Sequence, residues 1–253
     1  MKRFLYTLFT ISVIILGVLH AQNNSPSLLI SANAAMPAGD FGEDIGEEAN
    51  LTRRAGFNIG DDVGLAQPGF SLGAELYTPV GFTNFDWILS ARAVVNSSDI
   101  SAIEETFEHQ LGDTVDINFE FGNWINIPVM TGFRYNYPLT ANLRMYGLIQ
   151  AGINVTKAAS RKAIREIAGK DSTVEETTFD FTRDFGYEFG LGVELAHKFN
   201  IGFRYLALNS PRYQGTRKLS EKQFPKIFSR ENAILGEQRS ISIYLVTLGY
   251  YLF

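Results

Sequence analysis

Strict alternation of apolar and polar side chains from Arg183 to Ala196 constrains this chain more than any other feature. The apolar positions are Phe185, Tyr187, Phe189, Leu191, Val193 and Leu195, and the positions between them are Asp184, Gly186, Glu188, Gly190, Gly192 and Glu194. A helix would mix the two sets on every turn, whereas a strand places them on opposite sides of a sheet. The segment therefore predicts a β-strand with two chemically different sides.

The same period of two recurs along the chain and predicts eight strands. They span residues 27–36, 68–78, 84–96, 119–136, 142–156, 183–197, 200–208 and 240–253. In most of them the apolar side is clear, as with Ile125, Ile127, Val129 and Phe133 in the fourth. In the last segment both sides are partly apolar, and the side expected to be the apolar one holds Ile241, Ile243, Leu245, Gly249, Tyr251 and Phe253.

The connections between these strands alternate in length. Short ones lie at 79–83, 138–141 and Lys198-Phe199, and long ones at 37–67, 97–118, 157–182 and 209–239. Helical signals occur in two long connections, a capping-box pattern at Ser101 and Glu104 and the segment from Ala158 to Ala168. This rhythm predicts an all-β fold, an eight-stranded antiparallel up-and-down transmembrane β-barrel with short turns at one end and long external loops at the other.

Alternation alone also fits a soluble, lipocalin-like barrel, so other features must decide between the two classes. The lysines after residue 26 all lie in connections or at strand ends, although a water-facing strand surface would use lysine freely. Aromatic residues gather near both ends of the expected hairpins, as at the two lipid–water boundaries of a membrane barrel. Both features favour the membrane class.

The N-terminus has the pattern of a secretory signal peptide. Lys2 and Arg3 precede an apolar stretch from Phe4 to Leu19, and polar residues follow Ala21. We expect a signal peptide at 1–21 and a barrel domain at 22–253, with an uncleaved membrane anchor as the alternative. The chain has no Cys, which excludes disulfides, thiolate metal sites and cysteine nucleophiles.

Short motifs carry a family resemblance. They are Pro37-x-Gly39-Asp40-Phe41 after the first strand, and Ile125-Asn-Ile-Pro128-Val-Met-x-Gly132-x-x-Tyr135 in the fourth. With these motifs the chain resembles the PorT-like outer-membrane barrels, within the broader OmpA/OmpX-like eight-stranded group. The resemblance implies an integral barrel of the bacterial outer membrane, and some relatives are linked to protein secretion. With short periplasmic turns and a periplasmic N-terminus, the even number of strands places both termini in the periplasm. The ending with Tyr251 and Phe253 resembles the terminal signal that the barrel insertion machinery recognises.

The polar faces of the strands predict a charged barrel interior. The expected lumen network is Glu75, Arg92, Arg134, Arg144, Glu188, Glu194 and Arg204, and a hairpin at Lys198-Phe199 would place Glu194 opposite Arg204. Because an eight-stranded barrel is just wide enough for side chains, we expect a paired network that fills the lumen. A narrow solute or proton path is the alternative.

Charges in the long connections suggest surfaces for partners. The 37–67 and 97–118 segments are acidic, whereas 209–239 carries the bases Arg212, Arg217, Lys218, Lys222, Lys226 and Arg230. We expect these loops to form a binding or envelope-assembly surface. Four alternatives remain open: solvated loops without a ligand, cation binding by the acidic loops, contact of the basic loop with anionic lipopolysaccharide, or contact with another envelope or secretion protein. The partners expected are outer-membrane lipid and the insertion machinery, without nucleic acid, cofactor or metal.

An enzyme ranks lower than either a binding surface or a channel. A lipid-modifying enzyme needs a nucleophile, a His and a carboxylate within reach of one another. After the signal, the His residues are His109 in an external connection and His197 at a short turn, which lie at opposite ends of the expected barrel. We therefore predict a non-enzymatic protein with no catalytic residue.

Overall fold

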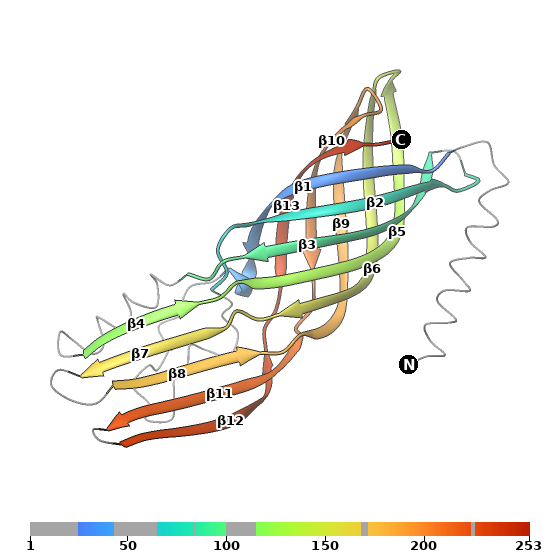
Figure 1. Ribbon diagram of the computed structural model, residues 1–253. Helices are drawn as coiled ribbons and strands as arrows, with labels where there is room; N and C mark the ends of the chain where they lie inside the picture. Colours follow the sequence, from blue (N-terminus) through green and yellow to red (C-terminus); the bar gives the residue numbers. More distant parts are fainter. Residues whose placement is uncertain (1–24, 43–64, 83, 100–114, 168–171, 224–225) are drawn as a thin grey trace, which may run out of the picture.

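Eight antiparallel strands close into a barrel in the computed structural model, which describes residues 25–42, 65–82, 84–99, 115–167, 172–223 and 226–253 (Figure 1). Around the barrel the order is β1-β13-β10-β9-β6-β5-β3-β2. The strands are β1 Ser27–Ala38, β2 Gly69–Pro79, β3 Phe85–Asn96, β5 Trp124–Thr140, β6 Leu143–Lys157, β9 Thr182–Leu195, β10 Phe199–Ala207 and β13 Ser242–Tyr251. The predicted fold class is confirmed.

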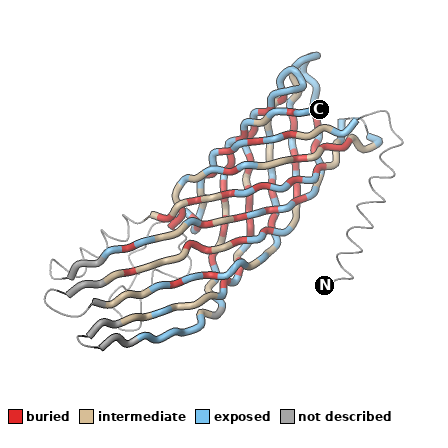
Figure 2. Tube along the Cα trace, in the orientation of Figure 1, coloured by how far each residue is buried: buried red, intermediate tan, exposed pale blue. Residues whose placement is uncertain are grey.

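Burial alternates residue by residue along the barrel strands (Figure 2). In β9 the apolar side faces outward, with Tyr187 43% and Phe189 47% exposed, while Glu188 between them is fully buried. Neighbouring strands follow the same rule, since the outward Ile149 of β6 is paired with Phe189. The barrel thus presents apolar side chains outside and encloses polar ones, which is the reverse of a soluble barrel.

A second sheet of five strands continues from one end of the barrel (Figure 1). We call it the extension sheet. Its strands are β4 Val115–Phe121, β7 Arg161–Ile167, β8 Ser172–Phe179, β11 Arg212–Gln223 and β12 Lys226–Gln238, in the order β12-β11-β8-β7-β4. Each adjoins a barrel strand in the chain, so the order repeats that of β13-β10-β9-β6-β5.

The extension sheet corrects the prediction of long loops. Most of 157–182 and 209–239 is strand, and the segment from Ala158 to Ala168, predicted to be helical, contains β7. Pairing with β4 and β8 overrides the local helix propensity of that segment. The fourth predicted strand is in fact two strands, β4 and β5, separated at Gly122 and Asn123. The capping-box pattern at Ser101 lies outside the described residues.

One row of charged residues runs across the extension sheet with alternating sign. The register aligns Glu120 of β4 with Lys162, Lys162 with Glu176, Glu176 with Lys218, and Lys218 with Glu231 of β12. Lys162 and Glu120 form an ion pair of 2.8 Å. Opposite charges placed directly across neighbouring strands favour this register over a slipped one.

The facing predicted for β13 is wrong. Ile243, Leu245 and Tyr251 point into the barrel and are buried, whereas Tyr244 and Leu248 are exposed on the outside. Both sides of this strand are apolar because its inner side packs in an apolar part of the lumen, so alternation could not distinguish them.

The described chain begins and ends at the barrel end formed by the short turns. The backbone N–H of Leu28 donates to the carbonyl oxygen of Phe253, and β1 pairs with β13 to complete the wall. The extension sheet lies at the opposite end (Figure 1). Among the described residues, no helix has the length and apolarity needed to span a membrane.

Candidate functional site: the barrel lumen and its open mouth

An apolar plug fills the lumen at the end that adjoins the extension sheet. It is made by buried side chains of several strands and the short 3-10 helix η1, Gly39–Phe41. Its members are Ala35, Phe41, Ala66, Val94, Trp124, Met130, Ala158, Ala159, Phe179, Leu206, Leu208, Tyr213, Ile241, Ile243 and Leu245. Trp124 lies at its centre, edge-on to Phe41 at 5.3 Å and to Tyr213 at 5.9 Å between ring centroids. These edge-to-face contacts pack the middle of the plug with aromatic rings.

Next to the plug, Glu75, Arg92, Glu188 and Arg204 form a charge quartet. Arg92 contacts Glu188 at 2.6 Å and Glu75 at 3.3 Å, while Arg204 contacts Glu75 at 2.8 Å and Glu188 at 3.0 Å. Each cation therefore bridges both carboxylates, and the quartet has no net charge. All four side chains are almost completely buried. Such pairing offsets the large cost of removing these charges from water.

Gln150 and Tyr77 add further hydrogen bonds to the quartet. Gln150 Nε2 donates to Glu188 at 3.4 Å, and the Gln150 side-chain oxygen accepts from the Ser90 hydroxyl at 2.7 Å. The Tyr77 hydroxyl donates to Glu75. This network fixes the positions of its members, with the buried Nε of Arg204 as the one atom of the quartet that has no hydrogen-bond partner among the described residues.

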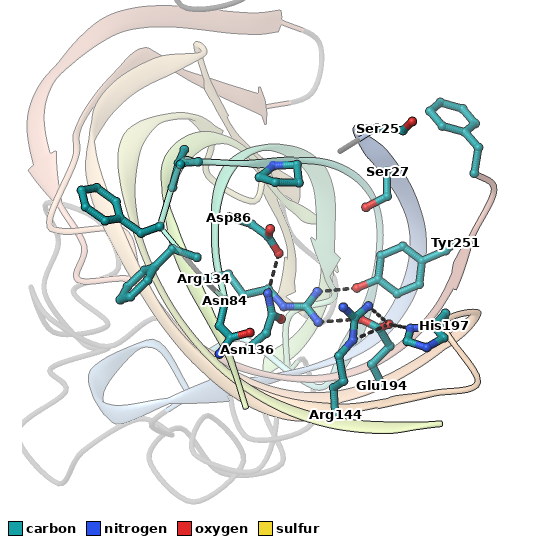
Figure 3. A pocket seen from close by; sticks show the side chains of 16 residues that line it. Ser25, Ser27, Asn84, Asp86, Arg134, Asn136, Arg144, Glu194, His197 and Tyr251 are labelled. Atoms are coloured by element: carbon teal, nitrogen blue, oxygen red, sulfur yellow. Dashed lines mark hydrogen bonds and ion pairs between the residues drawn. The ribbon is translucent and has the colours of Figure 1, made fainter. Parts of the chain in front are cut away.

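Glu194 is the centre of a second charged group, nearer the short turns. Arg134 donates to it at 2.7 Å, Arg144 donates through Nε at 3.1 Å, and His197 Nδ1 lies 3.3 Å away (Figure 3). Arg134 also donates to the hydroxyl of Tyr251 and lies 4.1 Å from the ring centroid of Tyr146. We call Arg134, Arg144, Glu194, His197 and Tyr251 the mouth cluster.

The mouth cluster lines a cavity of about 740 Å³ that lies at the short-turn end of the lumen. Figure 3 shows Asp86 on another part of its wall, where Asn136 Nδ2 donates to the Asp86 carboxylate at 2.6 Å. Phe82, Phe85 and Phe253 also line it. The cavity is therefore a polar recess bordered by aromatic residues, and Arg134 is among the side chains that line it.

The predicted pairing of Glu194 with Arg204 is wrong. Ala196 and His197 both take positive φ, 52° and 57°, and Lys198 N–H donates to the Leu195 carbonyl, so the hairpin turns before Lys198-Phe199. The register then aligns Glu194 with Asn200 and Arg204 with Gly190. A residue with a side chain at Gly190 would place its Cβ only 3.0 Å from Arg204 Cγ, so this glycine makes room for the arginine. Ala-His is not one of the Asn-Gly, Asp-Gly or Gly-Gly pairs that mark such turns, which is why the sequence did not indicate this turn.

The seven residues expected in the lumen therefore divide into two groups. Glu75, Arg92, Glu188 and Arg204 lie together in the quartet, and Arg134, Arg144 and Glu194 lie in the mouth cluster. Sequence reasoning missed the inward tyrosines at 77 and 146 and the cavity residue Asp86. All three are out of phase with the outward apolar positions of their strands, and this phase is the signal that could have identified them.

The bases expected in a partner-binding loop lie on β11 and β12 of the extension sheet. Arg217 forms an ion pair with Glu175, and Lys218 lies between Glu176 and Glu231 in the register. Arg212 and Arg230 are exposed, and the side chains of Lys222 and Lys226 lie outside the described residues. Much of the basic charge is therefore balanced within the sheet.

Glu237 connects the extension sheet to the barrel end through two cations. It contacts Arg239 at 2.7 Å and Arg161 at 2.9 Å. Burial alone would raise the pKa of the Glu237 carboxyl, but Arg161 and Arg239 outweigh burial and hold this pKa below its ordinary value. The carboxylate therefore stays charged at neutral pH, and it ties β12 to β7 across the sheet.

In the described part of the chain, no group of three or more His, Cys, Asp or Glu side chains is arranged to hold a metal ion. His109 lies outside the described residues, and His197 contacts Glu194 and the Ala141 carbonyl.

Comparison with known proteins gives distant structural likenesses. No protein-family model matches the chain, and no curated protein matches it. One similar solved structure is that of Ail, the attachment invasion locus protein of Yersinia pestis, in complex with the heparin analogue sucrose octasulfate. Ail is 12% identical to this chain, and the match covers 90% of this chain and 97% of Ail with a TM-score of 0.35. A major outer membrane protein of Thermus thermophilus is 9% identical over 90% of this chain and 100% of its own, with a TM-score of 0.39.

The toluene transporter TodX of P. putida is 8% identical, covering 92% of this chain and 91% of its own with a TM-score of 0.22. Scores this low carry no argument about function, which has to be argued from the barrel itself. The resemblance to PorT-like proteins in particular stays a prediction.

Proposed function

We propose that the chain is an integral β-barrel of the bacterial outer membrane, closed to solutes, that holds the extension sheet outside the cell as a binding or envelope-assembly surface. The observation that carries this proposal is the reversed distribution of side chains. Large apolar residues cover the outside of a closed barrel, while ion-paired charges are buried inside it. Lipid is the surrounding that makes this distribution favourable.

We infer the orientation from the different character of the two barrel ends. The short turns and both ends of the described chain lie at one end, and the extension sheet lies at the other. Exported barrels of this type keep their short turns in the periplasm and their longer segments outside. We therefore assign both termini to the periplasm, consistent with a chain exported behind a signal peptide at 1–21.

The closed lumen argues for a binding role rather than transport. The apolar plug and the charge quartet occupy successive levels of the lumen, and separating the quartet would leave buried charges unpaired. A channel is the second candidate, and the mouth cavity of about 740 Å³ is the observation in its favour. The two candidates differ in whether ions cross.

Planar bilayers test this difference. Purified protein is expected to insert, to migrate differently on gels before and after heating, and to show no stable open conductance. A steady conductance that disappears in an Arg204→Ala variant would establish the channel instead, because Arg204 lies in the quartet.

The binding surface needs a separate test in cells. Replacing 212–238 by a short turn removes β11 and β12, and envelope proteins that co-purify with the wild type should then be lost, while the barrel still fractionates with the outer membrane. A Glu120→Gln variant is the matched control, because it alters one exposed ion pair on the other edge of the extension sheet. Unchanged co-purification after removal of 212–238 would rule out this surface.

A further inference from the structure

Charged side chains on the eight barrel strands, all of which the structure describes, point inward with two exceptions. Glu75, Arg92, Arg134, Arg144, Glu188, Glu194 and Arg204 belong to the quartet or the mouth cluster, Asp86 lines the cavity, and Asp184 is paired with the buried Asn154. The exceptions are Lys157 and Arg183. A charge on the apolar outside of a barrel is costly at mid-membrane and tolerated near its boundary.

Lys157 and Arg183 lie side by side. Arg183 of β9 is paired with Val155 of β6, which is 37% exposed on the outside, and Lys157 is two residues further along β6. Thr156, between Val155 and Lys157 in β6, is buried, so Val155 and Lys157 lie on the same outer side of the strand. The Lys157 ammonium lies 5.6 Å from the ring centroid of the exposed Phe181. Such diagonal neighbours are about 7–8 Å apart, close enough for both side chains to reach one anionic group.

Neither cation is neutralised by its surroundings. Within the described residues, the contact recorded for Lys157 is with the Phe181 ring, and no ion pair joins Lys157 or Arg183 to a carboxylate. Asp184 follows Arg183 directly, but it is engaged by the Phe185 backbone N–H at 2.7 Å and by Asn209 at 3.4 Å. The pair therefore keeps its double positive charge for a ligand outside the barrel.

The position along the strand places this pair at headgroup level. The outward residues of β9 from Phe185 to Leu195 form the apolar band. At about 3.3 Å per residue along a strand tilted by about 40°, this length spans roughly 25 Å across the membrane. That is the height of the apolar band of an outer-membrane barrel, and Arg183 lies just beyond it on the side of the extension sheet.

We propose that Lys157 and Arg183 form a binding site for the phosphate of an anionic lipid in the outer leaflet. This inference rests on the membrane orientation proposed above. Arg183 and the Lys157 ammonium would share the phosphate oxygens, and the acyl chains would lie against Val155, Ile153 and Phe185, which are exposed directly beneath them. Bound lipid would also seal the wall at the junction of barrel and extension sheet.

The test uses lipid A as the probe, with folded protein in detergent micelles and bound lipid counted by native mass spectrometry. Wild-type protein is expected to retain lipid A, and a Lys157→Gln/Arg183→Gln variant should bind it at least tenfold more weakly, because each cation near an anionic surface contributes about a factor of five. Dephosphorylated lipid A should bind the wild type as weakly as intact lipid A binds the variant.

Matched controls locate the site. Lys198→Gln removes an exposed cation at the other end of the β9–β10 hairpin and should leave lipid A binding unchanged, as should Arg212→Gln on the extension sheet. Equal binding of lipid A by wild type and double variant would overturn the proposal. Displacement of lipid A by an equal concentration of inorganic phosphate would also overturn it, since the ligand would then be the free ion.

Failure of the membrane assignment itself would look different. In that case the wild type would not change its gel mobility on heating and would not enter lipid vesicles. The lipid site would then be overturned together with the proposed function.

Discussion

At the scale of single residues, the pairing of buried charges gives the lumen its structure. The quartet joins four strands, because Glu75 comes from β2, Arg92 from β3, Glu188 from β9 and Arg204 from β10. The sequence predicted that these residues face inward, since their phase in each strand is clear. It could not predict the partners, because the positive φ of Ala196 and His197 shifts the register that brings Arg204 to Gly190.

Removing one carboxylate from the quartet should be severely destabilising. In Glu188→Gln, Arg92 and Arg204 would share a single remaining carboxylate in a site that is closed to water. We expect a loss of about 3–5 kcal/mol in the free energy of unfolding. Urea titration in lipid vesicles, followed by the combined fluorescence of Trp87 and Trp124, measures it. Glu120→Gln, which breaks an exposed ion pair, should cost less than about 1 kcal/mol; equal losses would contradict the burial argument.

The last strand offers a second residue-scale prediction that tests its facing. Tyr251→Phe removes the hydroxyl that accepts from Arg134 inside the barrel, whereas Tyr250→Phe changes an exposed ring on the outside. We expect Tyr251→Phe to lower the free energy of unfolding by about 1–3 kcal/mol, because a buried donor loses its partner. The Tyr250→Phe variant should unfold like the wild type. The reverse order would restore the facing that alternation alone suggested.

At the scale of elements, the barrel strands were predictable and the extension strands were not. A strand between lipid and lumen must alternate, so β5, β6 and β9 are visible in the sequence. The extension strands carry polar residues on both sides, as in β8 with Thr173, Glu175 and Thr177 alternating with Val174 and Glu176, and no periodic signal arises. The residues of β7, rich in Arg, Lys, Glu and Ala, even favour a helix locally, and only pairing with its neighbours makes this segment a strand.

The ion pairs of Glu237 make the extension sheet sensitive to acid. Because the folded-state pKa of Glu237 is held below its ordinary value of 4.5, the carboxylate stabilises the folded sheet fully above that value. This stabilisation is lost as the pH falls below 4.5 and through the lowered folded pKa. We expect amide hydrogen exchange in β12 to accelerate over this range in the wild type. In Glu237→Gln exchange should be fast already at neutral pH, and its rate should change less with acid than in the wild type; identical pH profiles would contradict this role.

At the scale of the whole molecule, one closed wall separates two surroundings, and this division explains the composition. The mean hydropathy of −0.01 is the average of an apolar outside and a charged inside, so it resembles that of a soluble chain. We expect the barrel and the extension sheet to differ in local stability. The barrel strands are paired on both sides, whereas β4 and β12 are edge strands of the extension sheet.

Hydrogen exchange should therefore reveal two levels of protection. In vesicles at neutral pH, amides of β5, β6 and β9 are expected to exchange many times more slowly than those of β4 and β12, because the open edges leave backbone groups in water. Mass spectrometry of peptic fragments measures both sets in one sample. Equal protection across the barrel and the extension edges would show that the two sheets open as a single unit.

The continuity of five barrel strands into the extension sheet has a mechanical consequence. A pull on the tip of that sheet is directed along the strands, since β12-β11-β8-β7-β4 repeats the order of β13-β10-β9-β6-β5. Hydrogen bonds between antiparallel strands lie perpendicular to the strand direction, so such a force loads many of them together in shear instead of unzipping them one by one. A force applied at the tip of the extension sheet would thus pass directly into the barrel wall.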